Sequence, residues 1–464
     1  MSTFSGLSTA LSSLNAQRIA MEVTGQNIAN ANTVGYTRQR AELASVGAGQ
    51  TASLFSEGSK IGNGVKVTDV SRLGDIFLDA RVRATTSSAA FLAARADVYT
   101  RLESAVSEPS DTGIASALSE MWSAWQDVAK APQTLATKQV LLEQSKHVSA
   151  SISAGYSAIE TQWSQVRTEA AARVSDVNAL ADGVAELNGQ IRQILVSDGN
   201  ANELIDQRNQ LITQLSNLAG ATVRFQENGT ADVYVGGNPL VTADRAQHMK
   251  IAGSTDLAGV LAGNAPVQIV WERAGEPVVT FDGGEIQGKL SALAPVGQGG
   301  ILTEAAEQYN ELARQIASQI NGVLGSEGPL FAIGTDPAAR NLEVVITNPA
   351  DVPSATPGMG EYDGSLADAV SQLANAENGP SQLFQTFVVG LGVSAKATYN
   401  SAIVAESARA TAQNLQIAAT SVDIDEETVN LLTYQRGYQA ASRVMTAIDE
   451  MLDTLINRTG VVGR

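Results

Sequence analysis

The sequence predicts a mainly α, multidomain α+β protein in which a small antiparallel β domain is inserted into a body of long helices. Three observations support this: apolar residues with heptad spacing at both ends of the chain, helical periodicity over most of the rest, and strand-like alternation confined to residues 220–290. We expect the terminal helices to pair as a coiled coil. The predicted domains are a terminal coiled-coil assembly domain (1–75 with 421–464), a helical body domain (76–219 with 291–420) and the inserted β domain (220–290).

Residues 2–31 are predicted to form the first helix. Its apolar residues are spaced by three and four positions, with Arg18 and Gly25 in the two slots that break the pattern. The Asn, Thr and Gly residues that follow favour a helix end and a turn, and the alternating segments up to residue 72 favour extended chain. We predict an N-terminal assembly seam formed by Phe4, Leu7, Leu11, Leu14, Met21 and Ile28.

Helical periodicity continues from about residue 76 to residue 218. A Trp-containing helix ends at Pro132, and a very long helical stretch follows from residue 134 to about residue 196. Beyond the insert, the sequence predicts helices over 301–324 and 381–420, joined by a Pro- and Gly-rich segment with one strand at 342–346.

At Gly220 the spacing of apolar residues changes from helical to about two. Turns rich in Gly and Asn separate the apolar segments, which favours an antiparallel arrangement. We expect the insert to be entered after Gly220 and left near Gly288, with its ends close together, and to be removable without unfolding the helical body. The predicted strands are 222–225, 231–235, 267–271 and 278–281.

A long final helix is predicted over residues 423–458. Asp423 followed by Glu426 is typical of a capping box, and acidic residues suit the first turn of a helix. The spacing favours pairing with the first helix, although each terminal helix packing on its own local domain is an alternative interpretation. The predicted C-terminal assembly seam consists of Leu431, Tyr434, Tyr438, Ala441, Met445, Ile448, Leu452 and Leu455.

Composition argues against several classes of function. Lys and Arg number 30 against 48 Asp and Glu, a net charge of −18, so the chain lacks the basic surface that nucleic-acid binding requires. It has no cysteine, no apolar run long enough to span a bilayer, and no pattern of a cleaved secretory signal. His147 and His248 have no carboxylates at metal-binding spacing. We therefore predict a protein that is not an enzyme, with no catalytic residue, cofactor, metal, nucleic-acid partner or membrane partner.

Residues 29–39 resemble the N-terminal signature of the flagellar axial proteins, the family of rod, hook and hook-associated proteins. The motif residues are Asn30, Asn32, Thr33, Gly35, Tyr36, Arg38 and Gln39. The final helix, with Asp425-Glu426-Glu427, Asn430-Leu431-Leu432, Tyr434-Gln435, Tyr438-Gln439-Ala440 and Asp453-Thr454-Leu455, resembles the C-terminal signature. Two internal segments, 204–211 and 233–241, are similar to members found where hook meets filament.

The resemblance implies a structural adaptor of the bacterial flagellum that joins hook to filament and self-assembles through its terminal helices. It implies four partners: further copies of the chain in a ring, the hook protein, a second hook–filament junction protein, and an export chaperone that binds the C-terminal segment. It also implies an extracellular location in the flagellum, reached by type III export without a cleaved signal peptide.

Other interpretations remain open at this point. A flagellar hook or distal rod protein is the main alternative, although the helix around Asp206 that leads into a β insert argues against it. A secreted enzyme carried on an axial scaffold would need clustered His, Asp and Glu, which the insert lacks. A cytoplasmic coiled-coil binding module is a third alternative, which fractionation of shed flagella would test.

Overall fold

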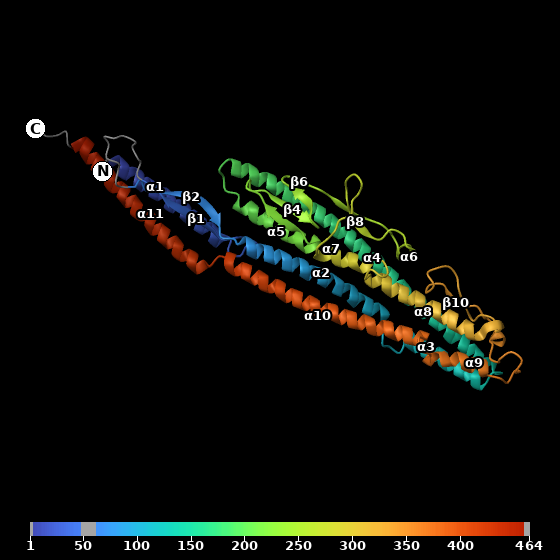
Figure 1. Cartoon of the computed structure of the whole chain (residues 1–464). Helices are drawn as coiled ribbons and strands as arrows, with labels where there is room; N and C mark the ends of the chain where they lie inside the picture. The colour runs from blue at the N-terminus through green and yellow to red at the C-terminus, as the bar shows by residue number, and fades with distance from the viewer. Residues whose placement is uncertain (1–2, 48–61, 459–464) are drawn as a thin grey trace, which may run out of the picture.

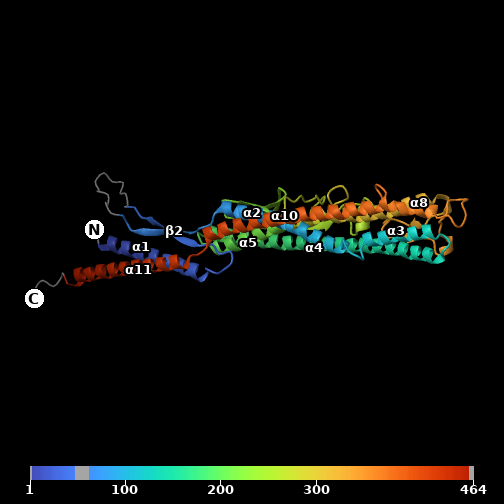
Figure 2. The ribbon, with the colours of Figure 1, turned by 90° about the horizontal axis from the view of Figure 1, so that it is seen from below.

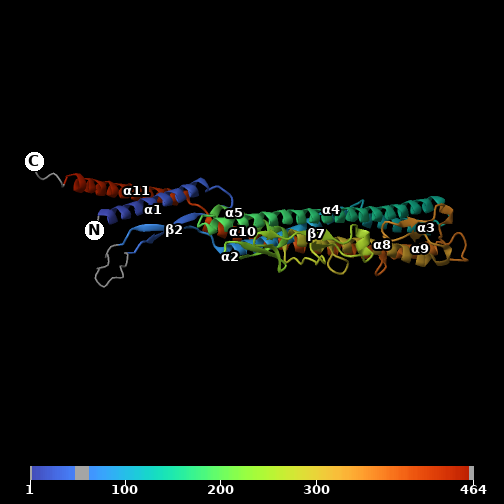
Figure 3. The ribbon, with the colours of Figure 1, turned by 90° about the horizontal axis from the view of Figure 1, so that it is seen from above.

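The computed structural model describes residues 3–47 and 62–458 of the chain. The protein is an elongated rod with a helix pair at one end and a longer helical body at the other (Figure 1). Views from below and from above show the first and last helices side by side at the same end of the rod (Figures 2 and 3). The prediction of a mainly α protein with small antiparallel sheets is confirmed.

Among the described residues, the terminal end of the rod contains two helices and two strands. Asp423 caps the last helix as predicted, because its carboxylate accepts from the backbone N–H of Asp425 at 2.9 Å and of Glu426 at 3.2 Å. The two strands pair antiparallel and pack against the first helix. The elements are α1 (Thr3–Ala29), β1 (Gln39–Ser45), β2 (Val65–Arg72) and α11 (Ile424–Asp453), which continues as a π-helical turn (Thr454–Arg458).

The helical body is built around α4 (Leu135–Val196), a single helix of 62 residues. The other body helices are α2 (Ile76–Val106), α3 (Ile114–Lys130), α5 (Asn202–Ala219), α8 (Ile301–Leu324) and α10 (Pro380–Thr420). Buried residues recur along the whole of α4 because it packs in turn against α3, α8, α2 and α5. Gly155 lets α8 approach closely: a Cβ there would lie 2.3 Å from the ring of Tyr309. Tyr309 makes an edge-to-face contact with Phe384 of α10, with 6.2 Å between ring centroids.

The inserted region forms two small antiparallel sheets that lie along α4 and α5 (Figure 1). The larger sheet has the strand order β3-β4-β5-β6, and the smaller one pairs β7 with β8. Three of the predicted strands are confirmed, but the prediction of a strand at 278–281 is wrong, because Val278 makes only an isolated bridge to Val270. The bounds are β3 (Thr222–Phe225), β4 (Ala231–Val235), β5 (Asn238–Thr242), β6 (Arg245–Ala246), β7 (Met249–Ala252), α6 (Leu257–Leu261) and β8 (Gln268–Trp271).

The chain enters the insert at Gly220 and returns beside it at Gly283, whereas the predicted exit was near Gly288. Gly220 has a left-handed backbone (φ +66°), and a Cβ on it would lie 2.9 Å from the backbone of Gly283. Directly after this contact, α7 (Gly284–Leu293) packs against α2 of the body, although the predicted insert runs to residue 290.

The structure does not support the expectation that the insert is removable. Trp271 of the insert belongs to one buried cluster with Val184 of α4 and Ile212 of α5. Part of the apolar surface of the body helices is therefore buried by the insert and would be exposed without it.

At the far end of the rod, β9 (Phe331–Ile333) and β10 (Leu342–Val344) form a two-stranded sheet, and α9 (Ser365–Ser371) packs on α3. The predicted strand at 342–346 is confirmed for its first three residues, while β9 and α9 were not predicted. Three 3-10 turns complete the described elements: Gly325–Glu327, Pro349–Asp351 and Gln372–Asn375.

Candidate functional site

The α1–α11 pair is the first part of the candidate site. α11 buries Ala441 and Ile448, and Ile448 lies against Gly6 of α1, where a Cβ would come within 3.1 Å of its side chain. Gly437 of α11 leaves room in the same way for Gln17 of α1, which an added Cβ would meet at 2.9 Å. Small residues on each helix thus accommodate larger ones on the other, which brings the two helices close together.

The structure places most of the predicted C-terminal seam at buried or half-buried positions. Ala441 and Ile448 are each 8% exposed. Gly437 lies against α1 beside the predicted Tyr438, which is 37% exposed, and Leu455 at the end of the seam is 52% exposed. The half-buried members are Leu431, Tyr434, Met445 and Leu452.

The predicted N-terminal seam is offset from the most buried face of α1. Leu11 is 51% exposed, and the side chain of Phe4 lies outside the described residues. Leu7, Leu14, Met21 and Ile28 are half-buried. The fully buried positions are instead small or polar: Ala10, Ala16, Ala20, Thr24 and Asn27.

The pair also exposes large apolar side chains. Val429, Val444 and Met451 of α11 are each more than half exposed. Leu432, Leu455 and Ile456 of the same segment are also exposed. An apolar surface of this kind, repeated along a helix, is typical of a protein-interaction site.

The second part of the candidate site is the linker between α1 and β1, which the predicted motif occupies. Asn27, at the end of α1, accepts hydrogen bonds from the Tyr36 hydroxyl and the Gln39 backbone N–H, each at 2.9 Å. Its Nδ2 donates to the Gln39 carbonyl at 2.8 Å and to Glu427 of α11 at 3.1 Å. Burial and the nearby carboxylates raise the pKa of Tyr36 to about 12, so its hydroxyl stays protonated and donates.

Arg38 makes the ionic contact between the linker and α11. Its Nε donates to Glu427 at 2.8 Å, and its Nη1 and Nη2 donate to the two carboxylate oxygens of Glu426 at 3.1 and 2.8 Å. Hydrogen bonding to Glu426 holds the pKa of Arg38 above its ordinary value. Glu427 is only 2% exposed, so loss of Arg38 would leave a buried carboxylate without its cation.

Asp206 of α5 holds the linker from the side of the body. Its Oδ2 accepts from the Thr37 backbone N–H at 3.0 Å, and its Oδ1 accepts from the Thr37 hydroxyl at 2.8 Å. The Arg72 guanidinium donates to the same Oδ1. Burial raises the pKa of Asp206, while Arg72 and Thr37 act in the opposite direction.

Two further motif residues contact α5. Gly35 has φ +82°, and a Cβ on it would lie 1.8 Å from Nε2 of Gln210, which donates to the carbonyl of Val34. The side chain of Gln39 accepts from Asn202 and donates to Glu203, each at 3.1 Å.

The remaining motif residues make local contacts, and Asn30 donates to the carbonyl of Gln26 in α1 at 3.0 Å. The Thr33 hydroxyl donates to the side-chain oxygen of Asn30 at 3.2 Å, and Asn32 is exposed. The motif as a whole therefore shapes the linker and joins it to α5 and α11.

Several residues that the structure adds to the site were not among the predicted ones, including Asn27, Arg72, Asp206 and Gln210. Asp206 and Gln210 lie in the segment 204–211, whose resemblance to flagellar proteins was already visible in the sequence. That resemblance carried no information about their partners, because Asp206 lies 169 residues from Thr37 in the chain.

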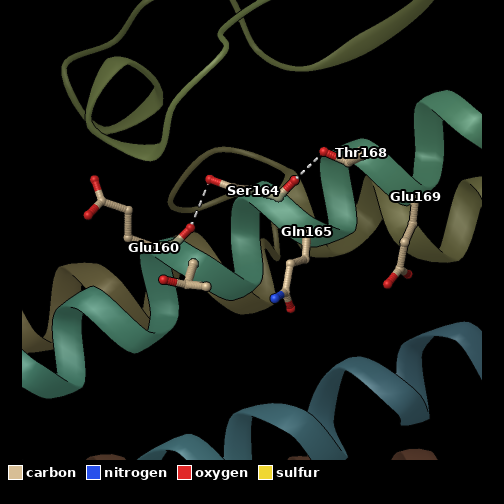
Figure 4. Close-up of a pocket in the computed structure, with 6 residues that line it drawn as sticks. Glu160, Ser164, Gln165, Thr168 and Glu169 are labelled. Carbon is tan, nitrogen blue, oxygen red and sulfur yellow. Dashed lines mark hydrogen bonds between the residues drawn. The ribbon is translucent and has the colours of Figure 1, made fainter.

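A pocket on the surface of α4 does not assemble catalytic chemistry (Figure 4). It is lined by Glu160, Thr161, Ser164, Gln165, Thr168 and Glu169. The hydroxyls of Ser164 and Thr168 donate to backbone carbonyls one turn earlier, at 3.0 and 2.9 Å, and Glu169 is paired with Arg101 and Lys289. In the part of the chain that the structure describes, no three His, Asp or Glu residues are grouped so as to hold a metal ion. None of the described helices is long and apolar enough to cross a membrane.

Three family models match parts of the chain. Residues 99–327 match the flagellar hook-associated protein FlgK helical domain. Residues 7–37 match the flagella basal body rod protein family, and residues 417–458 match the flagellar basal body rod FlgEFG protein C-terminal family.

Individual relatives show the same likeness. The chain is 27% identical to flagellar hook-associated protein 1 of Bacillus subtilis over 512 aligned residues, which cover 100% of both chains. It is 28% identical to flagellar hook-associated protein 1 of Escherichia coli over 54% of this chain and 45% of that protein. The structure resembles the flagellar hook junction protein FlgK from Burkholderia pseudomallei, with a TM-score of 0.61 and 15% identity over 73% of this chain and 99% of that chain.

Proposed function

This chain belongs to the flagellar hook-associated protein 1 family, and on that premise we propose that it joins hook to filament by self-assembly through its terminal helices. The observation that carries the proposal is the apolar surface that the α1–α11 pair leaves exposed, which includes Val429, Val444 and Met451. A surface with so many exposed apolar side chains gains free energy when neighbouring copies cover it.

We assign assembly to the terminal domain, residues 1–75 with 421–464. The predicted seams on α1 and α11 belong to this domain, and their half-buried members remain accessible to a neighbour. The helical body, 76–219 with 291–420, and the inserted domain, 220–290, then project away from the assembled helices as one rod.

The partners that we propose are other copies of the chain in a ring, the hook protein on one side and a second hook–filament junction protein on the other. We further propose an extracellular position at the hook–filament junction, reached by type III export without a cleaved signal peptide, and an export chaperone that covers the C-terminal segment beforehand. The exposed apolar residues of α11 support a chaperone, because this surface needs cover before assembly.

The role is structural rather than catalytic. The polar clusters of the candidate site bind parts of the chain to one another, and the Ser and Thr hydroxyls of the α4 pocket are already hydrogen-bonded within the helix. We therefore propose no substrate and no cofactor.

The experiment is complementation of a strain from which the coding sequence is deleted. The deletion strain should carry hooks without filaments and release filament subunits into the medium, and the intact chain should restore filaments. A chain that ends at Thr420, and so lacks α11, should not restore them, although its body helices are retained. A matched control with the exposed substitution Glu143→Gln on α4 should restore filaments fully. Normal filaments in the deletion strain would contradict the proposal.

A further inference from the structure

The terminal pair and the helical body are joined by two short non-helical crossings. One is formed by residues 73–75, between β2 and α2, and the other by residues 421–423, between α10 and α11. Ser421 is extended, with φ −68° and ψ 154°, so α10 does not continue into α11 as one helix. The covalent chain by itself therefore leaves the angle between pair and body free to vary.

The linker contacts one crossing directly and the last residue of α10, next to the other crossing. The backbone N–H of Arg38 donates to the carbonyl of Thr420 at 3.0 Å, and the carbonyl of Arg38 accepts from the N–H of Leu73 at 2.8 Å. The side chain of Arg38 also binds Glu426 and Glu427, so the linker is bonded to α11.

One segment of α5 reaches from the body onto this linker. It uses four residues, spaced so that they lie on neighbouring turns: Asn202, Glu203, Asp206 and Gln210. Asp206 binds Thr37 of the linker and Arg72 at the end of β2. Asn202 and Glu203 bind the side chain of Gln39, and Gln210 binds the carbonyl of Val34. These contacts connect the body directly to the terminal domain without involving either crossing.

The same segment is braced from behind by the inserted β domain. Arg208, only 2% exposed, donates to the carbonyl of Gly229 in the β3–β4 turn at 2.6 Å and to Asn188 of α4 at 3.1 Å. Asn188 also bonds to both backbone groups of Ala231 in β4, at 2.8 and 2.9 Å. Two positions apart on α5, Asp206 therefore faces the linker and Arg208 faces the insert.

We infer that residues 202–210 of α5 form a latch that sets the angle between the terminal pair and the helical body, and that the inserted β domain braces this latch. Asp206 and Gln210 act as positioning residues: they hold the linker and bind no external partner. The purpose of the latch rests on the proposed function, since copies that assemble through their terminal pairs need their bodies held at one common angle.

The test measures the angle in the purified full chain. The natural sequence has no cysteine, so Ala447→Cys on α11 and Ala93→Cys on α2, both exposed, accept nitroxide labels at two chosen points only. Double electron–electron resonance then gives the distribution of distances between terminal pair and body. In the otherwise unchanged chain we expect one narrow distribution.

Asp206→Asn removes the negative charge that pairs with Arg72 and replaces one carboxylate oxygen by an NH2 group that cannot accept from the Thr37 backbone N–H, so the distribution should broaden and shift. The side chain of Gln210 is half-buried, so Gln210→Ala should broaden the distance distribution without affecting folding. This variant still tests the latch if Asp206→Asn fails to fold. Gln207→Ala, exposed on the same helix between the two, is the matched control and should leave the distribution unchanged.

The brace is tested by Arg208→Lys, which keeps the charge but replaces the planar guanidinium whose Nη1 donates to both Gly229 and Asn188. It should broaden the same distribution while the melting temperature of the chain falls only slightly. A narrow, unshifted distribution in folded Asp206→Asn and Gln210→Ala chains would overturn the latch. Because the distances are measured on monomers, this result would be distinct from a failure of complementation, which would overturn the proposed function.

Discussion

Gly35 lies in the turn of the linker, against the side chain of Gln210. Its backbone adopts φ +82°, a left-handed conformation that is energetically unfavourable for a residue with a Cβ. The sequence predicted a turn at this point from its Asn, Thr and Gly residues. It did not predict Gln210 or Asp206 as partners, because local patterns contain no information about contacts between residues more than 160 positions apart. The motif was therefore recognisable as a motif, while its physical role required the folded chain.

Gly35→Ala, which adds one methyl group, tests whether the turn at Gly35 constrains the linker. The new Cβ would lie 1.8 Å from the Gln210 amide and would require a left-handed backbone, so we expect a loss of about 1–3 kcal/mol in the free energy of unfolding, measured by urea denaturation. Gly25→Ala is the control. Gly25 lies in α1, and a Cβ there meets nothing within 4 Å, so this change should stabilise the chain by up to about 1 kcal/mol. Equal effects of the two substitutions would show that the turn does not constrain the chain.

At the level of whole elements, the two terminal helices differ in how well the sequence predicted their contacts. The contact face of α11 includes Ala441, Met445 and Ile448, which the heptad pattern selected. The contact face of α1 instead uses Gly6 and Gln17, with Ala and Thr residues buried around them, and a search for apolar periodicity passes over such residues. The predicted stripe of Leu, Met and Ile therefore lies beside that face, half-buried.

Two substitutions on α11 separate contact within the pair from contact with a neighbour. Ile448 is 8% exposed against Gly6, whereas Val444, one turn earlier, is 52% exposed. Ile448→Asp would bury an unpaired charge, at a cost of several kcal/mol, so the terminal pair should separate and become susceptible to proteolysis in the monomer. Val444→Asp should leave the monomer's melting temperature and proteolysis pattern unchanged, yet cells carrying it should make hooks without filaments.

Export of both variants is checked by their appearance in the culture medium of a strain that lacks filaments. Filaments of normal number and length with Val444→Asp would show that the exposed surface of α11 is not an assembly contact. Resistance of Ile448→Asp to proteolysis would show that the α1–α11 contact contributes little to the stability of the pair.

Across the whole molecule, the nested order of terminal helices, helical body and β insert was predictable because each part has its own periodicity and because glycines mark the ends of the insert. The sharing of one core by insert and body was not predictable, since apolar periodicity identifies a buried face without identifying what buries it. α4 shows this directly: its buried residues belong to two clusters, one that includes residues of α3 and α8 and one that includes residues of α5 and the strands of the β domain.

This shared core predicts the outcome of removing the insert. Gly220 and Gly283 lie close enough for a short Gly/Ser linker to replace residues 222–282 without strain on the chain. The deletion would nevertheless uncover Val184, Ile212 and Leu215, which are fully buried against the insert, and each such side chain contributes about 1.5–3 kcal/mol when buried. We therefore expect a lower melting temperature, a less cooperative transition by circular dichroism, and binding of a dye that reports exposed apolar surface.

A matched control replaces the exposed loop 357–362 at the far end of the rod, which includes Met359 and Tyr362, by Gly and Ser residues. This loop belongs to neither buried cluster, so the control should melt as the intact chain does. If the insert deletion also melted like the intact chain, the helical body would be stable by itself and the β domain would not be part of its core. In that case the inserted domain would not support residues 202–210 of α5. Arg208→Lys should then leave the distances between the terminal pair and the body unchanged.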